Sequence, residues 1–142
     1  MMPSLQIVLP GHATKKNSPQ PGHRPSKAFQ RWEDACIPVL RRLRAERKDL
    51  PIGTAAKLNV TVYVKGQEGD AFGYGQAVGD LLDGTRAKFA HQRAQRQLGA
   101  LLPFRCDYQI IENDRLFNLG ASICVIRTDD APRTEIRIEW YP

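Results

Sequence analysis

The strongest constraint on the fold is the stretch 57–65, in which apolar and polar residues alternate strictly. Every second residue from Leu58 onward is aliphatic, and the residues between are Asn59, Thr61 and Tyr63. Successive side chains of a β-strand point to opposite faces, so this pattern predicts a strand with one buried and one solvated face. The chain must therefore build a sheet and cover one side of it.

Other segments have the composition of strands or of a loop. Residues 5–9 form a short apolar run closed by a Pro-Gly pair, and residues 134–140 alternate apolar with charged side chains. Residues 107–112 and 121–127 are predicted to be two further strands. Residues 12–25 contain three prolines and no periodicity, which predicts a loop.

Three segments are predicted to be helical. Ser26 is the expected N-cap of the first helix, whose apolar face repeats at steps of three or four residues: Phe29, Trp32, Cys36, Leu40 and Leu43. Pro38 interrupts this pattern and is expected to kink or split the helix. Residues 75–82 are predicted to form a short helix that starts in a glycine-rich turn, and residues 86–100 have helical composition.

Composition sets the broad class. The length of 142 residues suits one domain, and 42% hydrophobic residues is too many for a disordered tail. No stretch approaches the roughly 20 apolar residues of a membrane span, and no signal peptide is recognisable. Cys36, Cys106 and Cys124 lie outside any CxxC motif, so a reducing cytoplasm is expected. These features predict a single α+β domain over residues 1–142, with helices packed on a mixed β-sheet.

The net charge of +6 is unevenly distributed. Residues 1–50 carry ten basic and four acidic side chains, and residues 84–105 carry five basic side chains and no acidic one. Acidic residues are in excess in the other two stretches. Basic surface of this kind often binds a polyanion, because each neutralised phosphate releases counterions. A solvated arginine-rich surface is the alternative, and composition alone does not decide between them.

The acidic residues in the middle of the chain stand at the ends of predicted elements. Asp70 follows the strand at 57–65, Asp80 lies in the short helix that Asp83 ends, and Asp114 occupies a turn between apolar segments. Carboxylates placed beside a basic surface suit Mg²⁺-dependent phosphodiester chemistry, because Mg²⁺ prefers hard oxygen ligands and bridges phosphate oxygens. An aspartate after a strand is, however, more often a turn former or a cap.

Four motifs occur in order along nearly the whole chain. They are PGHATKKNS at 10–18, PSKAFQRWE at 25–33, Gly-Asp and AVGDLL within 69–82, and IEND at 111–114 followed by PRTEI at 132–136. Together they resemble the RusA family of Holliday-junction resolvases, especially its phage and prophage members. The resemblance implies a RusA-like fold and a homodimer with one acidic site per subunit. Each site would nick one strand of a four-way DNA junction with Mg²⁺.

The resemblance assigns the catalytic and metal-binding roles to Asp70, Asp80 and Asp114. The chain departs from the family pattern where the core motif has a second aspartate and a lysine, which here are Phe72 and Gln76. The first aspartate of the family's acidic turn is replaced by an asparagine. Three carboxylates are candidates to replace the missing one: Asp83, Glu68 and Glu112.

The second departure is a basic insertion at about 84–108, which is either a DNA-contacting arm or a solvated surface helix. The predicted DNA contacts are Lys15, Lys16, Arg24, Lys27, Arg93 and Arg96. Branched DNA is the expected partner, without a membrane, in the cytoplasm of a bacterial host cell. Two alternatives remain open: a catalytically silent branched-DNA-binding protein on the same scaffold, and a protein-interaction module whose positive charge is incidental.

Overall fold

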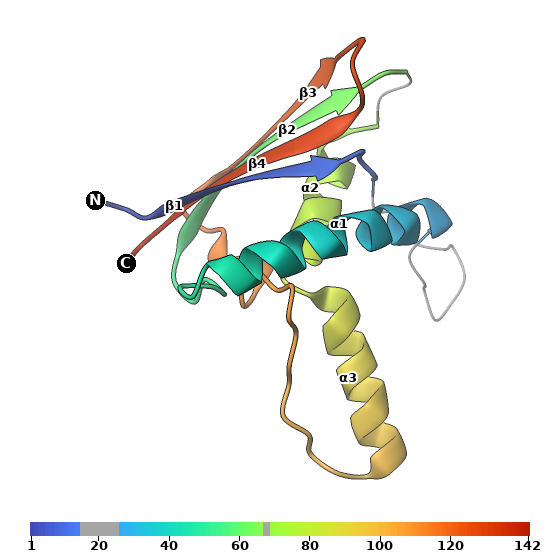
Figure 1. Ribbon diagram of the computed structural model, residues 1–142, viewed down its shortest axis with the longest axis vertical. Helices are drawn as coiled ribbons and strands as arrows, with labels where there is room; N and C mark the ends of the chain where they lie inside the picture. Colours follow the sequence, from blue (N-terminus) through green and yellow to red (C-terminus); the bar gives the residue numbers. More distant parts are fainter. Residues whose placement is uncertain (15–25, 67–68) are drawn as a thin grey trace.

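The structure is a computed structural model that describes residues 1–14, 26–66 and 69–142. Four strands form one mixed sheet in the order β1-β4-β2-β3, with β2 and β3 parallel and the other neighbours antiparallel. The strands are β1 (Ser4–Pro10), β2 (Ala56–Val64), β3 (Ala121–Arg127) and β4 (Arg133–Trp140). Helices pack on one side of this sheet (Figure 1), so the predicted α+β class is confirmed.

The buried face of the sheet follows the alternation that the sequence predicts. Along β2 the aliphatic residues are buried and the polar ones between them are partly exposed. The strand register aligns Ile7 and Val60 with Ile136 of β4, which lies between them, so one row of apolar side chains crosses three strands. All three are buried, and burial of apolar side chains such as these is the dominant favourable term in folding.

The helix α1 (Lys27–Glu46) begins where the sequence predicts. The hydroxyl of Ser26 accepts a hydrogen bond from the Phe29 N–H at 3.2 Å, and the indole of Trp32 donates to the Pro10 carbonyl at 3.1 Å. The predicted split at Pro38 does not occur, because the helix is continuous there. Pro38 and Asp34 are both exposed, so the carbonyl that loses its helical partner lies on the solvent side.

The helix α2 (Ala71–Leu82) begins four residues earlier than predicted, and the expected glycine-rich turn is its first helical turn. Asp70 caps it by accepting the Gly73 N–H at 2.7 Å, and the buried Tyr74 hydroxyl accepts the Gly69 N–H at 3.0 Å. The cap provided by Asp70 and the burial of Tyr74 outweigh the low helix propensity of the glycines in this turn. Gly75 lies close to β3, because a Cβ there would stand 2.6 Å from Ile123 Cδ1 and would displace the end of that side chain.

Residues 107–112 are not the strand that the sequence predicts. Ile110 N and Ile111 N donate to the Leu82 carbonyl at the end of α2, at 2.8 and 3.2 Å, and two further backbone hydrogen bonds join the segment to Ile52. A single bridge joins Ile111 to Ile52. The segment is apolar because it is buried against α2, and not because it belongs to the sheet.

The helix α3 (Thr85–Leu98) confirms the helical prediction for the basic segment, but none of its residues is buried. It continues from α2 through Gly84, whose φ of 72° is a left-handed conformation that favours glycine. Figure 1 shows α3 extending away from the sheet, with the chain returning beside it. Of the helices in the described part of the chain, none has the length and apolar character needed to cross a bilayer.

Candidate metal centre

Three carboxylates converge at the corner between α2 and α3. Asp80 and Asp83 come from the end of α2, and Asp114 begins the short 3₁₀ helix η1 (Asp114–Leu116). One carboxylate oxygen of each residue lies within 4.8 Å of those of the other two. Asp80 and Asp83 are three residues apart, a spacing that places side chains on one side of a helix. Asp114 lies against α2 at Gly79, where its Oδ2 is 3.5 Å from the position a Cβ would take, an ordinary contact distance.

Asp83 is the most enclosed of the three, with 5% of its surface exposed. Its Oδ1 accepts hydrogen bonds from Thr85 N at 2.9 Å and Thr85 Oγ1 at 2.5 Å, which orient the carboxylate and cap the start of α3. Burial raises the pKa of Asp83, opposed by the Thr85 hydrogen bond and the positive charge of Lys88. The negative charges of Asp114 and Asp80 raise the pKa further.

The cluster can hold a metal ion. Divalent cations such as Mg²⁺ and Ca²⁺ prefer oxygen ligands at about 2.0 to 2.6 Å, which places neighbouring ligand atoms roughly 3 to 4 Å apart. The three carboxylates match this donor type, and one oxygen of each lies within 4.8 Å of the others. A cation there would also offset the mutual repulsion that raises the pKa of Asp83.

Lys88 is a cation at this site that the sequence did not single out. Its Nζ lies 4.0 Å from Asp83 Oδ2 and donates a hydrogen bond to the Glu112 carbonyl at 2.7 Å. The sequence signal was weak, because Lys88 belongs to the basic stretch that the family comparison treated as an insertion. The proximity of Lys88 to the acidic cluster follows from the start of α3 directly after Asp83.

Asp70 is at the other end of α2 from the cluster. Ten residues of helix separate it from Asp80, which corresponds to about 15 Å along the axis. The structure therefore brings Asp80 and Asp114 together, as the sequence predicted, but places Asp70 apart from them as a helix cap. Phe72 is 84% exposed on the first turn of α2 and does not fill the space between the three carboxylates.

Of the two candidate replacements that the structure describes, Asp83 and Glu112, it is Asp83 that reaches the cluster. The Glu112 carboxylate lies elsewhere, 3.2 Å from the position that a Cβ on Gly53 would take. Glu68 lies outside the described residues. The sequence alone leaves Asp83 as one of three candidates for the missing carboxylate. The number of residues between the end of α2 and the turn at Asp114 does not tell how far apart they lie in space.

The predicted DNA contacts fall into two groups. Lys15, Lys16 and Arg24 lie outside the described residues. Lys27 is exposed at the start of α1, and Arg93 and Arg96 are exposed on α3. The structure thus places two of the predicted basic residues on the helix that leads away from the acidic cluster.

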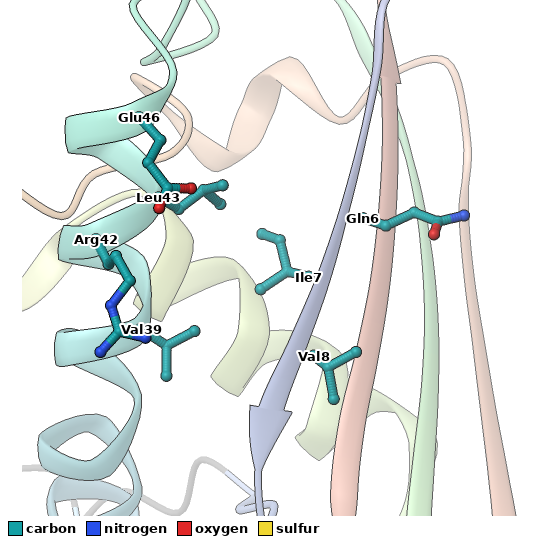
Figure 2. A pocket seen from close by; sticks show the side chains of 7 residues that line it. All are labelled: Gln6, Ile7, Val8, Val39, Arg42, Leu43 and Glu46. Atoms are coloured by element: carbon teal, nitrogen blue, oxygen red, sulfur yellow. The ribbon is translucent and has the colours of Figure 1, made fainter.

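A hollow between α1 and β1 is separate from this site (Figure 2). Its apolar wall includes Ile7 of β1 and Val39 and Leu43 of α1, and its lining residues all come from these two elements. None of the three clustered aspartates lines it. The acidic cluster therefore lies apart from this hollow, at the corner between α2 and α3, with Asp83 buried and Asp114 exposed.

Comparison of the sequence with models of known protein families finds no match, and comparison with curated proteins finds none either. The resemblance to RusA resolvases therefore rests on the four motifs alone. The features of the chain that bear on its function are the geometry of Asp80, Asp83 and Asp114 and the basic helix beside them.

Proposed function

We propose that this protein is a Mg²⁺-dependent, structure-selective DNA endonuclease that nicks Holliday junctions or related branched DNA. The observation that supports it most is the convergence of Asp80, Asp83 and Asp114 at the foot of a helix that carries basic but no acidic residues. Oxygen ligands for a divalent ion next to a surface that attracts phosphate are the two requirements of metal-assisted phosphodiester cleavage.

Each residue of the site has a definable task. Asp80, Asp83 and Asp114 would hold Mg²⁺, which when bound lowers the pKa of a coordinated water and neutralises charge on the phosphate. Thr85 fixes the orientation of the Asp83 carboxylate through two hydrogen bonds. Lys88 is held by the Glu112 carbonyl, so its ammonium group is positioned to attract a phosphate oxygen near the cluster.

The RusA resemblance supports the finer parts of the proposal. It favours a homodimer in the cytoplasm of a bacterial host cell, with two sites that cut opposite strands of a four-way junction. Lys15, Lys16, Arg24 and Lys27 would then contact the junction backbone, as would the arginines of α3. A catalytic role for Asp70 stays a prediction, carried by the motif and not by the position of the cluster.

A second candidate is a catalytically silent branched-DNA-binding protein on the same scaffold. It is favoured by Phe72 and Gln76, which replace charged residues of the family's core motif, and by the use of Asp70 as a helix cap. It predicts junction binding that needs no divalent ion and survives loss of the acidic cluster. Its affinity would fall steeply with salt, as phosphate contacts require.

The direct test is cleavage of a synthetic four-way junction with each strand labelled in turn, in Mg²⁺ and in EDTA. Wild type should nick only in Mg²⁺, and Asp114→Asn should lose about 100-fold or more in rate while still binding the junction. Asp129→Asn, which changes an exposed aspartate of the β3–β4 turn, is the matched control and should cleave normally. Binding without cleavage in Mg²⁺ or Mn²⁺ would establish the silent binder instead.

A further inference from the structure

The helix α3 has two faces in different environments. Along one face the returning chain is attached by side chains: Gln95 Oε1 accepts the Leu102 N–H at 2.9 Å, and His91 Nε2 lies 2.7 Å from the Leu102 carbonyl oxygen. The His91 ring also meets Phe104 edge to face, with centroids 5.4 Å apart. The returning chain therefore covers part of this face, and Leu98 on the same side of the helix is 67% exposed.

The opposite face is open. At 100° per residue, Phe89, Gln92, Arg93 and Arg96 form one stripe, and all four are exposed. We call these four residues the outer stripe. In the part of the chain that the structure describes, Arg93 and Arg96 have no carboxylate partner, and residues 84–106 contain no acidic side chain. The stripe thus presents two unpaired guanidinium groups and a side-chain amide to solvent.

Ion pairs and hydrogen bonds at the base of the helix fix its direction. Arg86 pairs with Asp34 of α1 at 2.5 Å. On the returning chain, Arg41 pairs with Asp107 at 2.8 Å, and Arg44 donates to the Gln109 carbonyl at 2.6 Å. Both ends of the projecting segment are therefore attached to α1. A helix held in this way presents its outer stripe in one orientation relative to the acidic cluster, at low entropic cost on binding.

We propose that the outer stripe enters the major groove of a duplex DNA arm and gives the protein a base-sequence preference. DNA is the partner that the charge of the stripe favours, because the stripe is cationic and the grooves of DNA are flanked by negatively charged phosphates. An α-helix about 10–12 Å across fits a major groove about 12 Å wide. Gln92 can pair bidentately with adenine, and Arg93 and Arg96 with guanine, so the stripe carries groups that distinguish bases.

The composition of the stripe favours DNA over two other partners. Phe89 is its one large apolar residue, 57% exposed, which is too little apolar surface to insert a helix into a membrane interface. A protein partner would be expected to meet an apolar or aromatic cluster at the centre of the contact. The inference rests on the proposed function for the identity of the ligand, but binding by α3 does not require the metal site.

The test is DNA binding in EDTA, measured by fluorescence anisotropy and by sequencing the bound fraction of a randomised duplex. The double variant Arg93→Gln/Arg96→Gln should bind at least about tenfold more weakly at low salt, with a salt slope reduced by about two. Arg93→Lys/Arg96→Lys keeps the charge but loses the bidentate geometry, so it should retain most of the affinity and lose the sequence preference. Arg42→Gln, which removes one positive charge from the exposed side of α1, is the control for a general loss of charge and should change neither property.

The outcomes separate this inference from the proposed function. Junction cleavage that is unchanged in the glutamine double variant, with unchanged affinity, overturns the inference and leaves the nuclease intact. Sequence-dependent binding through α3 without any cleavage supports the inference and contradicts the nuclease. Absence of DNA binding by wild type overturns both. Binding to phosphatidylserine vesicles that the glutamine variant alone loses, with DNA affinity unchanged, would assign the stripe to a membrane surface and overturn the inference.

Discussion

The sheet with α1 and α2 buries most of its apolar side chains, whereas α3 and the chain that returns from it bury almost none of theirs before residue 108. We call the first region the body and residues 85–105 the arm. Ile138 in the body is fully buried, while Leu98 and Leu101 in the arm are 67% and 94% exposed. Surface that is never removed from water contributes little to folding. The body's sequence is therefore explained by what it packs inside, whereas burial does not explain the sequence of the arm.

Asp83 belongs to both regions, because it ends α2 in the body and bonds to Thr85 at the start of the arm. The candidate metal centre therefore stands where the stable region meets the projecting one. A nuclease with this arrangement would hold DNA with the arm and cut it at the corner. The following predictions test the contrast, from the largest expected effect to the smallest.

The largest effect is expected for a large-to-small change in the body. Ile138→Ala on the central strand β4 should lower the free energy of unfolding by about 2–5 kcal/mol, because it leaves a cavity in the packed core. Leu98→Ala in the arm should change it by less than about 0.5 kcal/mol. Urea unfolding of both variants measures the difference, and equal losses would show that the arm is part of the folded core.

A smaller loss is expected at the start of α1. Ser26→Ala removes the hydroxyl that accepts the Phe29 N–H, and should cost about 1 kcal/mol of unfolding free energy in the same assay. Ser122→Ala, an exposed serine on the edge strand β3, is the control and should be close to neutral. An unchanged stability in Ser26→Ala would show that the start of α1 does not depend on its cap.

A substitution at Asp83, at the corner between α2 and α3, is expected to stabilise the folded state, unlike the two substitutions above. Burial raises the pKa of Asp83 above its ordinary 3.8, so the folded state holds this proton more tightly than the unfolded state does. Its contribution to stability is then full below pH 3.8 and is lost as pH rises through the folded-state pKa. Asp83→Asn keeps an oxygen to accept from Thr85 but carries no charge, and should raise Tm at pH 7 in metal-free buffer. A lower Tm in this variant would mean that the charged carboxylate stabilises the corner without a cation.

Removing the arm should have the smallest effect on folding. Replacing residues 89–104 with a short Gly-Ser linker leaves the base contacts of Arg86, Lys88 and Asp107 in place. The free energy of unfolding should change by less than about 1 kcal/mol, while DNA affinity falls at least tenfold. A truncated chain that unfolds, or that binds DNA as well as wild type does, would contradict the division into body and arm.

The sequence predicted the strands and helices wherever one periodicity dominated. The alternation at 57–65 and the apolar repeat from Phe29 to Leu40 are local patterns, and both elements formed as expected. Residues 107–112 were misread, because an apolar segment buried against a helix end has the same composition as a strand. The glycines before residue 76 indicated a turn, but capping by Asp70 and burial of Tyr74 made them helical.

The site was predictable only in part. Asp80 and Asp114 were expected to lie together, and they do, but the expectation came from motif resemblance and not from spacing. The same motif resemblance predicts Asp70 as a ligand, and its distance from the cluster follows only from the start of α2 at that residue. Asp83 and Lys88 lie at the site because α3 begins directly after α2. The composition of the sequence does not predict this change of direction between the two helices.

The central claim is that Asp80, Asp83 and Asp114, without Asp70, form a divalent-metal site at the foot of the arm. The most direct measurement is titration of the purified protein with Mn²⁺, a spectroscopic probe for a Mg²⁺ site, followed by electron paramagnetic resonance. Wild type and Asp70→Asn should each bind one ion per chain with similar affinity, and Asp80→Asn should lose that binding by tenfold or more. Binding that disappears in Asp70→Asn and persists in Asp80→Asn would contradict the account.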